Sequence, residues 1–266
     1  MSATPDIPRI TSTGSVRPPD VVVERICTRF AETGVIVFED VMPHETIAEL
    51  TQAYLQGYTD YHRDMMFEDA RHVGDRRNMI TITLDGPFND PMVYAPAFMM
   101  PVIKRLLGDV AILGSFVAVT SLAGSEEQHT HRDMPLLFGD DQLGAAVPAY
   151  CLNLVIPFVD MNDVNGTTAF LAGSHHAIGE EPAGIEPQAP DVGIGDVMLF
   201  DCRVWHFGTP NRSNAPRPVL YNSYQRPWFR DAINFDLQAP LTVSQRALDQ
   251  VPDEHRHLFE WAMKPR

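Results

Sequence analysis

Two histidines, one aspartate and one arginine stand where they could hold a metal ion and a dicarboxylic acid. His131 and Asp133 are separated by one residue, His206 follows far downstream, and Arg217 comes eleven residues after His206. Two imidazoles and one carboxylate on one face of a metal leave coordination positions open, which suits ferrous iron in oxygen-activating enzymes. The planar guanidinium of Arg217 can bind the distal carboxylate of a co-substrate through two parallel hydrogen bonds. These residues predict an oxygenase that uses Fe(II) and a keto acid.

The surrounding segments must position these side chains, because His-x-Asp alone is a weak signal in a chain with ten histidines and 35 acidic residues. Residues 110–123 form an apolar, β-branched run between two glycines, which is typical of a buried strand. His131 and Asp133 follow this run, and on an extended chain side chains i and i+2 point the same way. Further strands are predicted at 197–201 and 219–225. We therefore expect the metal and co-substrate groups on neighbouring strands of one barrel.

Five sequence elements occur in a fixed order. They are Gln128-His129-Thr130-His131-Arg132-Asp133, then Asn165-Gly166-Thr167-Thr168 leading into Gly173-Ser174-His175, then Gly195-Asp196, and last His206-Phe207-Gly208 with Asn211, Ser213 and Arg217. In this order they resemble the phytanoyl-CoA dioxygenase family of Fe(II)- and 2-oxoglutarate-dependent oxygenases, from about residue 20 to about residue 230.

The resemblance implies a role for individual residues. His131, Asp133 and His206 would be the iron ligands, and Arg217 would bind the distal carboxylate of 2-oxoglutarate. Gln128 and Thr168 would be further co-substrate contacts. Some relatives carry a hydroxyl residue two positions after the second histidine, where this chain has Gly208. A contact made there must come from elsewhere or be absent.

Ordinary structural explanations compete with these roles. We interpret His129 as a packed neighbour of the motif and His175 as a histidine that hydrogen-bonds backbone, so neither is counted as a ligand. Without its spacing from His206, Arg217 would be interpreted as a surface arginine between two prolines. Asp133 alone would be an exposed loop carboxylate.

Helical periodicity precedes strand-like patterns along the chain. Residues 1–19 are predicted to be a flexible N-terminal arm, and residues 20–266 a single oxygenase domain. Helices are expected at 21–33 with Asp20 as N-cap, 44–58, 97–107 and 242–263, and early strands at 35–39 and 79–86. This order predicts an α+β protein, a double-stranded β-helix or cupin-like jelly roll braced by helices.

Net charge, apolar segments and cysteine content limit which classes of binding partner and which cellular compartment the sequence predicts. The formal net charge of −15 disfavours nucleic acid and anionic membranes as partners, although Arg71, His72, Arg76 and Arg77 form a local basic cluster. The first residues are polar and lack the apolar block of a secretory signal, and no run of about 18 apolar residues suggests a membrane span. Three widely spaced cysteines suggest a reducing compartment, and we expect a cytoplasmic protein.

The substrate is not encoded in a motif. Five residues near the motifs are candidate substrate contacts, although aromatic and methionine side chains equally fill ordinary cores: Met79, Phe138, Asn153, Trp205 and Phe229. The resemblance implies oxidation, by default hydroxylation, of a small molecule by dioxygen, with release of succinate and CO2. A secondary metabolite or modified amino acid is favoured as substrate, and a homodimer is plausible.

Two other functions stay open at this point. One is a cupin-like metalloenzyme, an isomerase or hydrolase that uses the same three ligands without 2-oxoglutarate. The other is a non-catalytic binding protein that has kept the site. Dependence of turnover on 2-oxoglutarate distinguishes the first, and oxygen consumption in a single turnover distinguishes the second.

Overall fold

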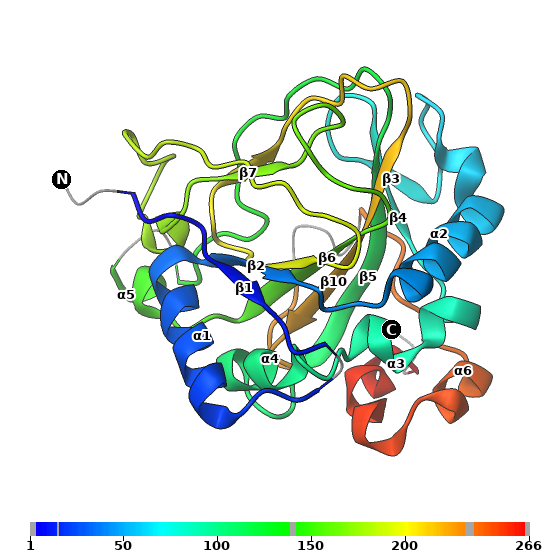
Figure 1. Cartoon of the computed structure of the whole chain (residues 1–266), viewed down its shortest axis with the longest axis horizontal. Coiled ribbons are helices and arrows are strands. Elements are labelled where there is room, and N and C mark those ends of the chain that lie inside the picture. The colour runs from blue at the N-terminus through cyan, green and yellow to red at the C-terminus, as the bar shows by residue number, and fades with distance from the viewer. Residues whose placement is uncertain (1–3, 15, 139–141, 232–236, 264–266) are drawn as a thin grey trace.

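An eight-stranded sheet forms the centre of the molecule (Figure 1). The computed structural model describes residues 4–14, 16–138, 142–231 and 237–263. In the order in which they lie side by side, the strands are β1 (Arg9–Thr11), β2 (Val35–Glu39), β8 (Val197–Asp201), β6 (Cys151–Pro157), β10 (Arg217–Gln225), β5 (Ile112–Ser121), β4 (Arg77–Thr81) and β3 (Ala70–His72). Its neighbouring strands are antiparallel except for the parallel pair β1 and β2. A separate two-stranded ladder contains β7 (Thr168–Phe170) and β9 (His206–Gly208).

Helices brace this sheet, as Figure 1 shows. They are α1 (Asp20–Thr33), α2 (His44–Tyr58), α3 (Pro91–Tyr94), α4 (Met100–Leu107), α5 (Gln142–Ala146) and α6 (Gln245–Gln250). Short 3-10 turns lie at Thr59–Tyr61, Gly86–Asn89, Ser174–His176, Asp253–Leu258 and Glu260–Met263. Helix α1 ends where Gly34 adopts a left-handed φ of 72° and donates its N–H to the Phe30 carbonyl. None of the described helices is long and apolar enough to cross a membrane.

Side chains that alternate along the strands pack into two separate hydrophobic cores, one on each face of the sheet. On β6, Leu152, Leu154 and Ile156 belong to the large core shared with the helices. The alternate residue Val155 belongs to a second core that includes Phe170 of the small ladder. The sheet therefore lies between the helices on one face and the ladder on the other. This arrangement confirms the predicted jelly roll with bracing helices, and it places the motif residues between sheet and ladder.

The structure differs from the sequence expectations at the two ends of the domain. Residues 9–11 of the predicted arm form β1 and pair with β2 at the edge of the sheet. The helix expected over 242–263 is α-helical only at α6, with two 3-10 turns after it. Pro252 ends the α-helix, because proline lacks a backbone N–H and disfavours helical geometry in the residue before it.

Candidate active site

The segment 128–134 runs beside β9, with an isolated antiparallel bridge between His131 and His206. His131 and His206 exchange both backbone hydrogen bonds, each N–H donating to the other's carbonyl at 2.9 Å. Further along, the N–H of Gln128 donates to the Gly208 carbonyl and that of Met134 to the Cys202 carbonyl. The two histidines are thereby held directly opposite each other.

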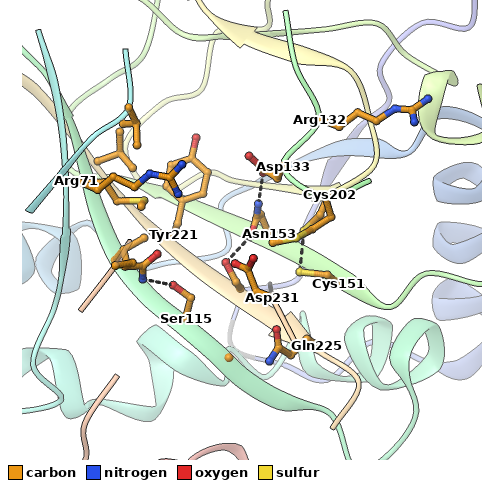
Figure 2. A pocket seen from close by; sticks show the side chains of 18 of the residues that line it. Arg71, Ser115, Arg132, Asp133, Cys151, Asn153, Cys202, Tyr221, Gln225 and Asp231 are labelled. Carbon is orange, nitrogen blue, oxygen red and sulfur yellow. Dashed lines mark hydrogen bonds between the residues drawn. The ribbon is translucent and has the colours of Figure 1, made fainter. Parts of the chain in front are cut away.

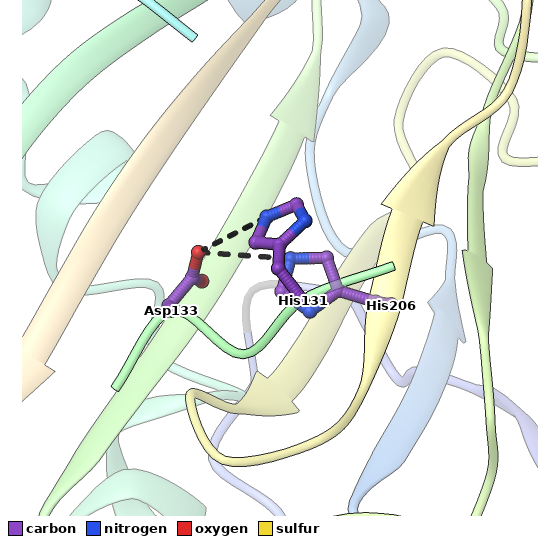
Figure 3. Close-up of side chains that lie close together, drawn as sticks. All are labelled: His131, Asp133 and His206. Atoms are coloured by element: carbon purple, nitrogen blue, oxygen red, sulfur yellow. Dashed lines mark ion pairs between the residues drawn. The ribbon is translucent and has the colours of Figure 1, made fainter. Parts of the chain in front are cut away.

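Three side chains converge at this pairing, as Figure 3 shows. One ligand atom from each of His131, Asp133 and His206 lies within 4.8 Å of the others. The Oδ1 atom of Asp133 is 3.9 Å from Nε2 of His131 and 3.6 Å from Nε2 of His206. These separations suit three donors that share one ion, and two imidazoles with one carboxylate suit Fe(II). The donor set therefore fits the predicted metal.

Backbone contacts orient both imidazole rings. Nδ1 of His131 donates to the His129 carbonyl, and Nδ1 of His206 donates to the Val204 carbonyl, each at 2.9 Å. A carbonyl can only accept, so the proton of each neutral ring lies on Nδ1 and the Nε2 lone pair is free for a metal. Burial, followed by the neighbouring His206, lowers the pKa of His131, which favours the neutral ring that metals require.

The two oxygens of Asp133 have different surroundings. Oδ1 faces the histidines, whereas Oδ2 accepts a 2.7 Å hydrogen bond from the Asn153 amide. The amide oxygen of Asn153 in turn accepts a 2.5 Å hydrogen bond from Ser223. Figure 2 shows the contact between Asn153 of β6 and the carboxylate, and the Ser223 hydrogen bond connects it to β10. Asn153, a sequence candidate for substrate contact, is thus engaged with Asp133 and Ser223.

We expect Asn153→Ala to weaken Fe(II) binding by about 10- to 100-fold, because partners that orient a metal ligand have effects of this size. Ser223→Ala removes only the contact that orients Asn153, so its effect should be smaller. Anaerobic titration with Fe(II) measures both. An Asn153→Ala variant with unchanged iron affinity and a raised KM for substrate would show that Asn153 contacts the substrate and does not orient the metal ligand.

Two buried arginines lie on the face of the sheet that also carries Asn153 and Ser223. Arg217 on β10 and Arg77 on β4 both pair with Ser121 of β5, so their side chains share one face of the sheet. They are 4% and 1% exposed. Arg77 donates to the carbonyls of Asp75 and Thr209, but its Nε and that of Arg217 have no partner among the described residues. Two adjacent buried cations with unused donors form a site for an anion.

Burial is the main influence on the charge of Arg217. Burial, opposed by Tyr221 and reinforced by the nearby Arg77, lowers the pKa of this guanidinium to about 10. At neutral pH the group is therefore charged and largely desolvated. A carboxylate is the ligand that such a group lacks.

Gln128 occupies the space that a side chain at position 208 would need. A Cβ on Gly208 would lie 2.5 Å from Oε1 of Gln128 and 3.3 Å from Nε of Arg77. Oε1 of Gln128 accepts the Gly208 N–H at 2.8 Å, and its amide group donates to the Val73 carbonyl. In this structure Gln128 therefore joins β9 to the segment before Arg77.

A cavity of about 1040 Å³ surrounds the metal cluster. His131, Asp133 and His206 line it, together with five other sequence candidates: Gln128, Thr168, Met79, Asn153 and Phe229. Arg217 does not line it, but is buried on the same face of β10 as the lining residues Tyr221 and Ser223. A volume of this size holds a drug-sized ligand as well as a small co-substrate.

Two other candidates lie outside this cavity. Phe138 is 72% exposed, although Leu136 two residues before it is buried. Trp205 stacks against the Arg132 guanidinium at 4.7 Å, and Figure 2 shows Arg132 pointing away from the other labelled residues. Among the histidines, His175 hydrogen-bonds backbone as expected, with its Nε2 donating to the Ala31 carbonyl at 3.2 Å.

Sequence reasoning missed the other cavity residues of β10. Tyr221, Ser223 and Gln225 line the cavity, and they alternate with residues that face the helices. They share the period-two face of Arg217, so that periodicity could have identified them. Tyr221 hydrogen-bonds Thr168, and burial, followed by the Asp133 carboxylate, raises its pKa. Its hydroxyl is therefore neutral, and both Asp133 and Arg217 influence its pKa.

Two cysteines that are distant in sequence also meet in the cavity wall. The thiol of Cys202 donates to Sγ of Cys151 at 2.8 Å, and both side chains are buried. Burial raises the pKa of Cys202 well above its usual value. Both are free thiols, so among the described residues no disulfide supports the fold.

Comparison with sequence families gives one match that covers most of the chain. The sequence profile of phytanoyl-CoA dioxygenase (PhyH) matches residues 30–219. The chain is 24% identical over 177 residues to the dioxygenase af480 of Aspergillus fumigatus, which covers 64% of this chain and 55% of that protein. It is 22% identical over 212 residues to the dioxygenase cdmA of Talaromyces verruculosus, which covers 74% and 70%. The match therefore spans little more than half of the first relative.

Solved structures of EctD from S. alaskensis have a similar fold. The apo form superimposes with a TM-score of 0.60 at 20% identity and covers 81% of each chain. The form with 2-oxoglutarate and 5-hydroxyectoine gives a TM-score of 0.60 at 20% identity, with 76% of this chain and 75% of EctD covered.

Proposed function

The chain belongs to the phytanoyl-CoA dioxygenase family of Fe(II)- and 2-oxoglutarate-dependent oxygenases, and from this premise we propose that it oxidises a small organic molecule. Hydroxylation of a secondary metabolite or a modified amino acid, with release of succinate and CO2, is the reaction that we favour. One observation carries the proposal. Arg217, a buried guanidinium whose Nε has no partner among the described residues, shares the face of β10 with Tyr221 and Ser223, which line the same cavity as a cluster of two histidines and one carboxylate.

We assign roles to the residues as follows. His131, Asp133 and His206 hold Fe(II), while Arg217 binds the distal carboxylate of 2-oxoglutarate and Arg77 adds a second positive charge beside it. When bound, iron and 2-oxoglutarate supply the oxidising power, through oxidative decarboxylation of the keto acid with dioxygen.

The protein's own contribution is orientation and exclusion of water. Nδ1 contacts fix both histidine rings, and Asn153 directs Oδ1 of Asp133 toward the metal. The apolar side chains of the cavity limit access of water to the reacting atoms, which protects a reactive oxidant from side reactions. Tyr221 is placed to donate a hydrogen bond to a co-substrate carboxylate near Arg217.

The two alternatives explain less of this site. A cupin-like isomerase or hydrolase needs the three metal ligands but gives no reason to bury Arg217 and Arg77 together without a counter-anion. A non-catalytic binding protein gives no reason for the oriented Asp133. The cytoplasmic location, the homodimer and the lack of a nucleic-acid partner stay predictions from the sequence.

Succinate formation tests the proposal directly. Purified protein, prepared anaerobically with Fe(II) and 2-oxoglutarate, is exposed to oxygen, and succinate is quantified with and without 2-oxoglutarate-binding competitors. Slow uncoupled decarboxylation is expected even without the true substrate. Absence of succinate together with absence of Fe(II) and 2-oxoglutarate binding would exclude the oxygenase and favour the cupin-like alternative.

A further inference from the structure

Arg71 lies on the wall of the active-site cavity without a partner. It is half-buried on β3, lines the cavity, and forms no hydrogen bond or ion pair with the described part of the chain. Its register places it in one row with Met79, Val119 and Val219 across four neighbouring strands. Residues of one row point to the same face of a sheet, so Arg71 shares the face of Arg217. Figure 2 shows its side chain directed toward Tyr221.

The other charged groups of the wall are engaged. Arg132 donates to the Ala177 carbonyl and stacks on Trp205. Arg230 and Asp231 each have an interaction partner, and Asp133 belongs to the metal cluster. Arg71 is therefore the cation of the described cavity wall that lacks a counter-charge.

The charged side chains of the cavity lining are in balance positive, whereas the whole chain is strongly negative. The described lining contains three arginines, two aspartates, and no lysine or glutamate. The complete chain contains 35 acidic and 20 basic residues. A bound divalent metal would make the cavity still more positive. A positive cavity in a strongly negative protein selects anions from solution.

The co-substrate does not account for Arg71. Its row lies two residues along the strands and three strands across from Arg217, which in a flat sheet corresponds to roughly 15 Å between the two backbones. With its distal carboxylate at Arg217 and its keto acid end at the metal, 2-oxoglutarate has no charged group left for Arg71. The free guanidinium therefore faces the space that remains for the substrate.

The rest of that space is mainly apolar. Its described walls include Met79, Ile112, Val117, Met134, Phe229, Leu241 and Trp261. A cavity with apolar walls and one unpaired guanidinium matches an amphiphile with one acidic group. We propose that Arg71 binds a carboxylate of the substrate, so that this oxygenase acts on an organic acid with an apolar body. This assignment rests on the oxygenase activity proposed above.

Binding of matched acids and amides tests the assignment. The anaerobic enzyme loaded with Fe(II) and 2-oxoglutarate is titrated calorimetrically with 4-phenylbutyrate, decanoate and indole-3-acetate, and with the primary amides of the same acids. Wild type should bind the acids at least about tenfold more tightly than the amides, as a charge-assisted hydrogen bond provides. Arg71→Gln should lose this advantage and Arg71→Lys should keep part of it. Arg63→Gln, an exposed arginine of the preceding segment paired with Asp60, should behave as wild type.

The outcomes separate this inference from the proposed function. If the acids have no advantage over the amides in wild type, or keep it in Arg71→Gln, the assignment of Arg71 is wrong. If Arg71→Gln instead weakens 2-oxoglutarate binding, Arg71 belongs to the co-substrate site and the inference is also overturned. Wild type that binds no 2-oxoglutarate and forms no succinate would refute the proposed function itself. Melting temperatures of the variants show whether each one is folded.

Discussion

Asp133→Ala is expected to abolish Fe(II) binding and succinate formation. Asp133 is the charged member of the three-residue cluster, and its Oδ1 lies within 4 Å of both histidine Nε2 atoms. Without it, two neutral imidazoles would hold the ion. Loss of a partner that merely orients a ligand costs about 10- to 100-fold, so loss of the ligand should cost more than about a hundredfold in iron affinity. Anaerobic Fe(II) titration and a succinate assay measure the two effects.

The variant must also be shown to fold. Removal of the carboxylate leaves the Asn153 amide without its acceptor, which costs about 1–3 kcal/mol if no water replaces it. Asp163→Ala removes an exposed loop carboxylate and should leave iron binding and turnover unchanged. A folded Asp133→Ala protein that still binds Fe(II) as tightly as Asp163→Ala would show that the metal lies elsewhere.

The elements that could be predicted from the sequence are those with local signals. Helix α1 ends before Gly34 as expected and begins at Asp20, one residue before the predicted start, because an amphipathic period and a terminal glycine are local sequence signals. Helix α2 follows the predicted range for the same reason. Strand β4 ends at Thr81, although alternation predicted a strand as far as residue 86. Strand length depends on the partner strand, which a local pattern does not specify.

The cavity depends on pairings that are distant in the chain. His131 and Asp133 stand out because they are neighbours in sequence, and His206 through its spacing to Arg217. Arg71 faces the same cavity because β3 pairs with β4 and β4 with β5. No local pattern contains this information. Phe138 illustrates the converse, since a position near a motif does not place a side chain in the site.

Replacement of Arg217 is expected to have the second large effect. It should leave the stability of the apoprotein unchanged or raise it, but it should weaken the binding of 2-oxoglutarate. Its guanidinium is buried, its Nε lacks a partner among the described residues, and Arg77 adds a like charge nearby. Burial lowers its pKa to about 10. Since a pKa unit corresponds to about 1.4 kcal/mol, charging this group costs the apoprotein on the order of 3 kcal/mol. The folded pKa lies below the unfolded one, so this cost is fully present below pH 10 and is relieved only as pH rises through 10.

We therefore expect Arg217→Met to leave the melting temperature of the apoprotein unchanged or raise it by a few degrees, because an apolar side chain replaces an unpaired buried charge. The same change should weaken 2-oxoglutarate binding by about a hundredfold or more, since it removes the partner of a desolvated carboxylate. Calorimetry on the anaerobic Fe(II) protein and thermal unfolding measure the two effects, with the exposed Arg212→Met as control. Unchanged 2-oxoglutarate affinity would contradict the assigned role. A large loss of apoprotein stability would show instead that Arg217 supports the fold. A buried charge that serves to bind a ligand should destabilise the apoprotein until that ligand is bound.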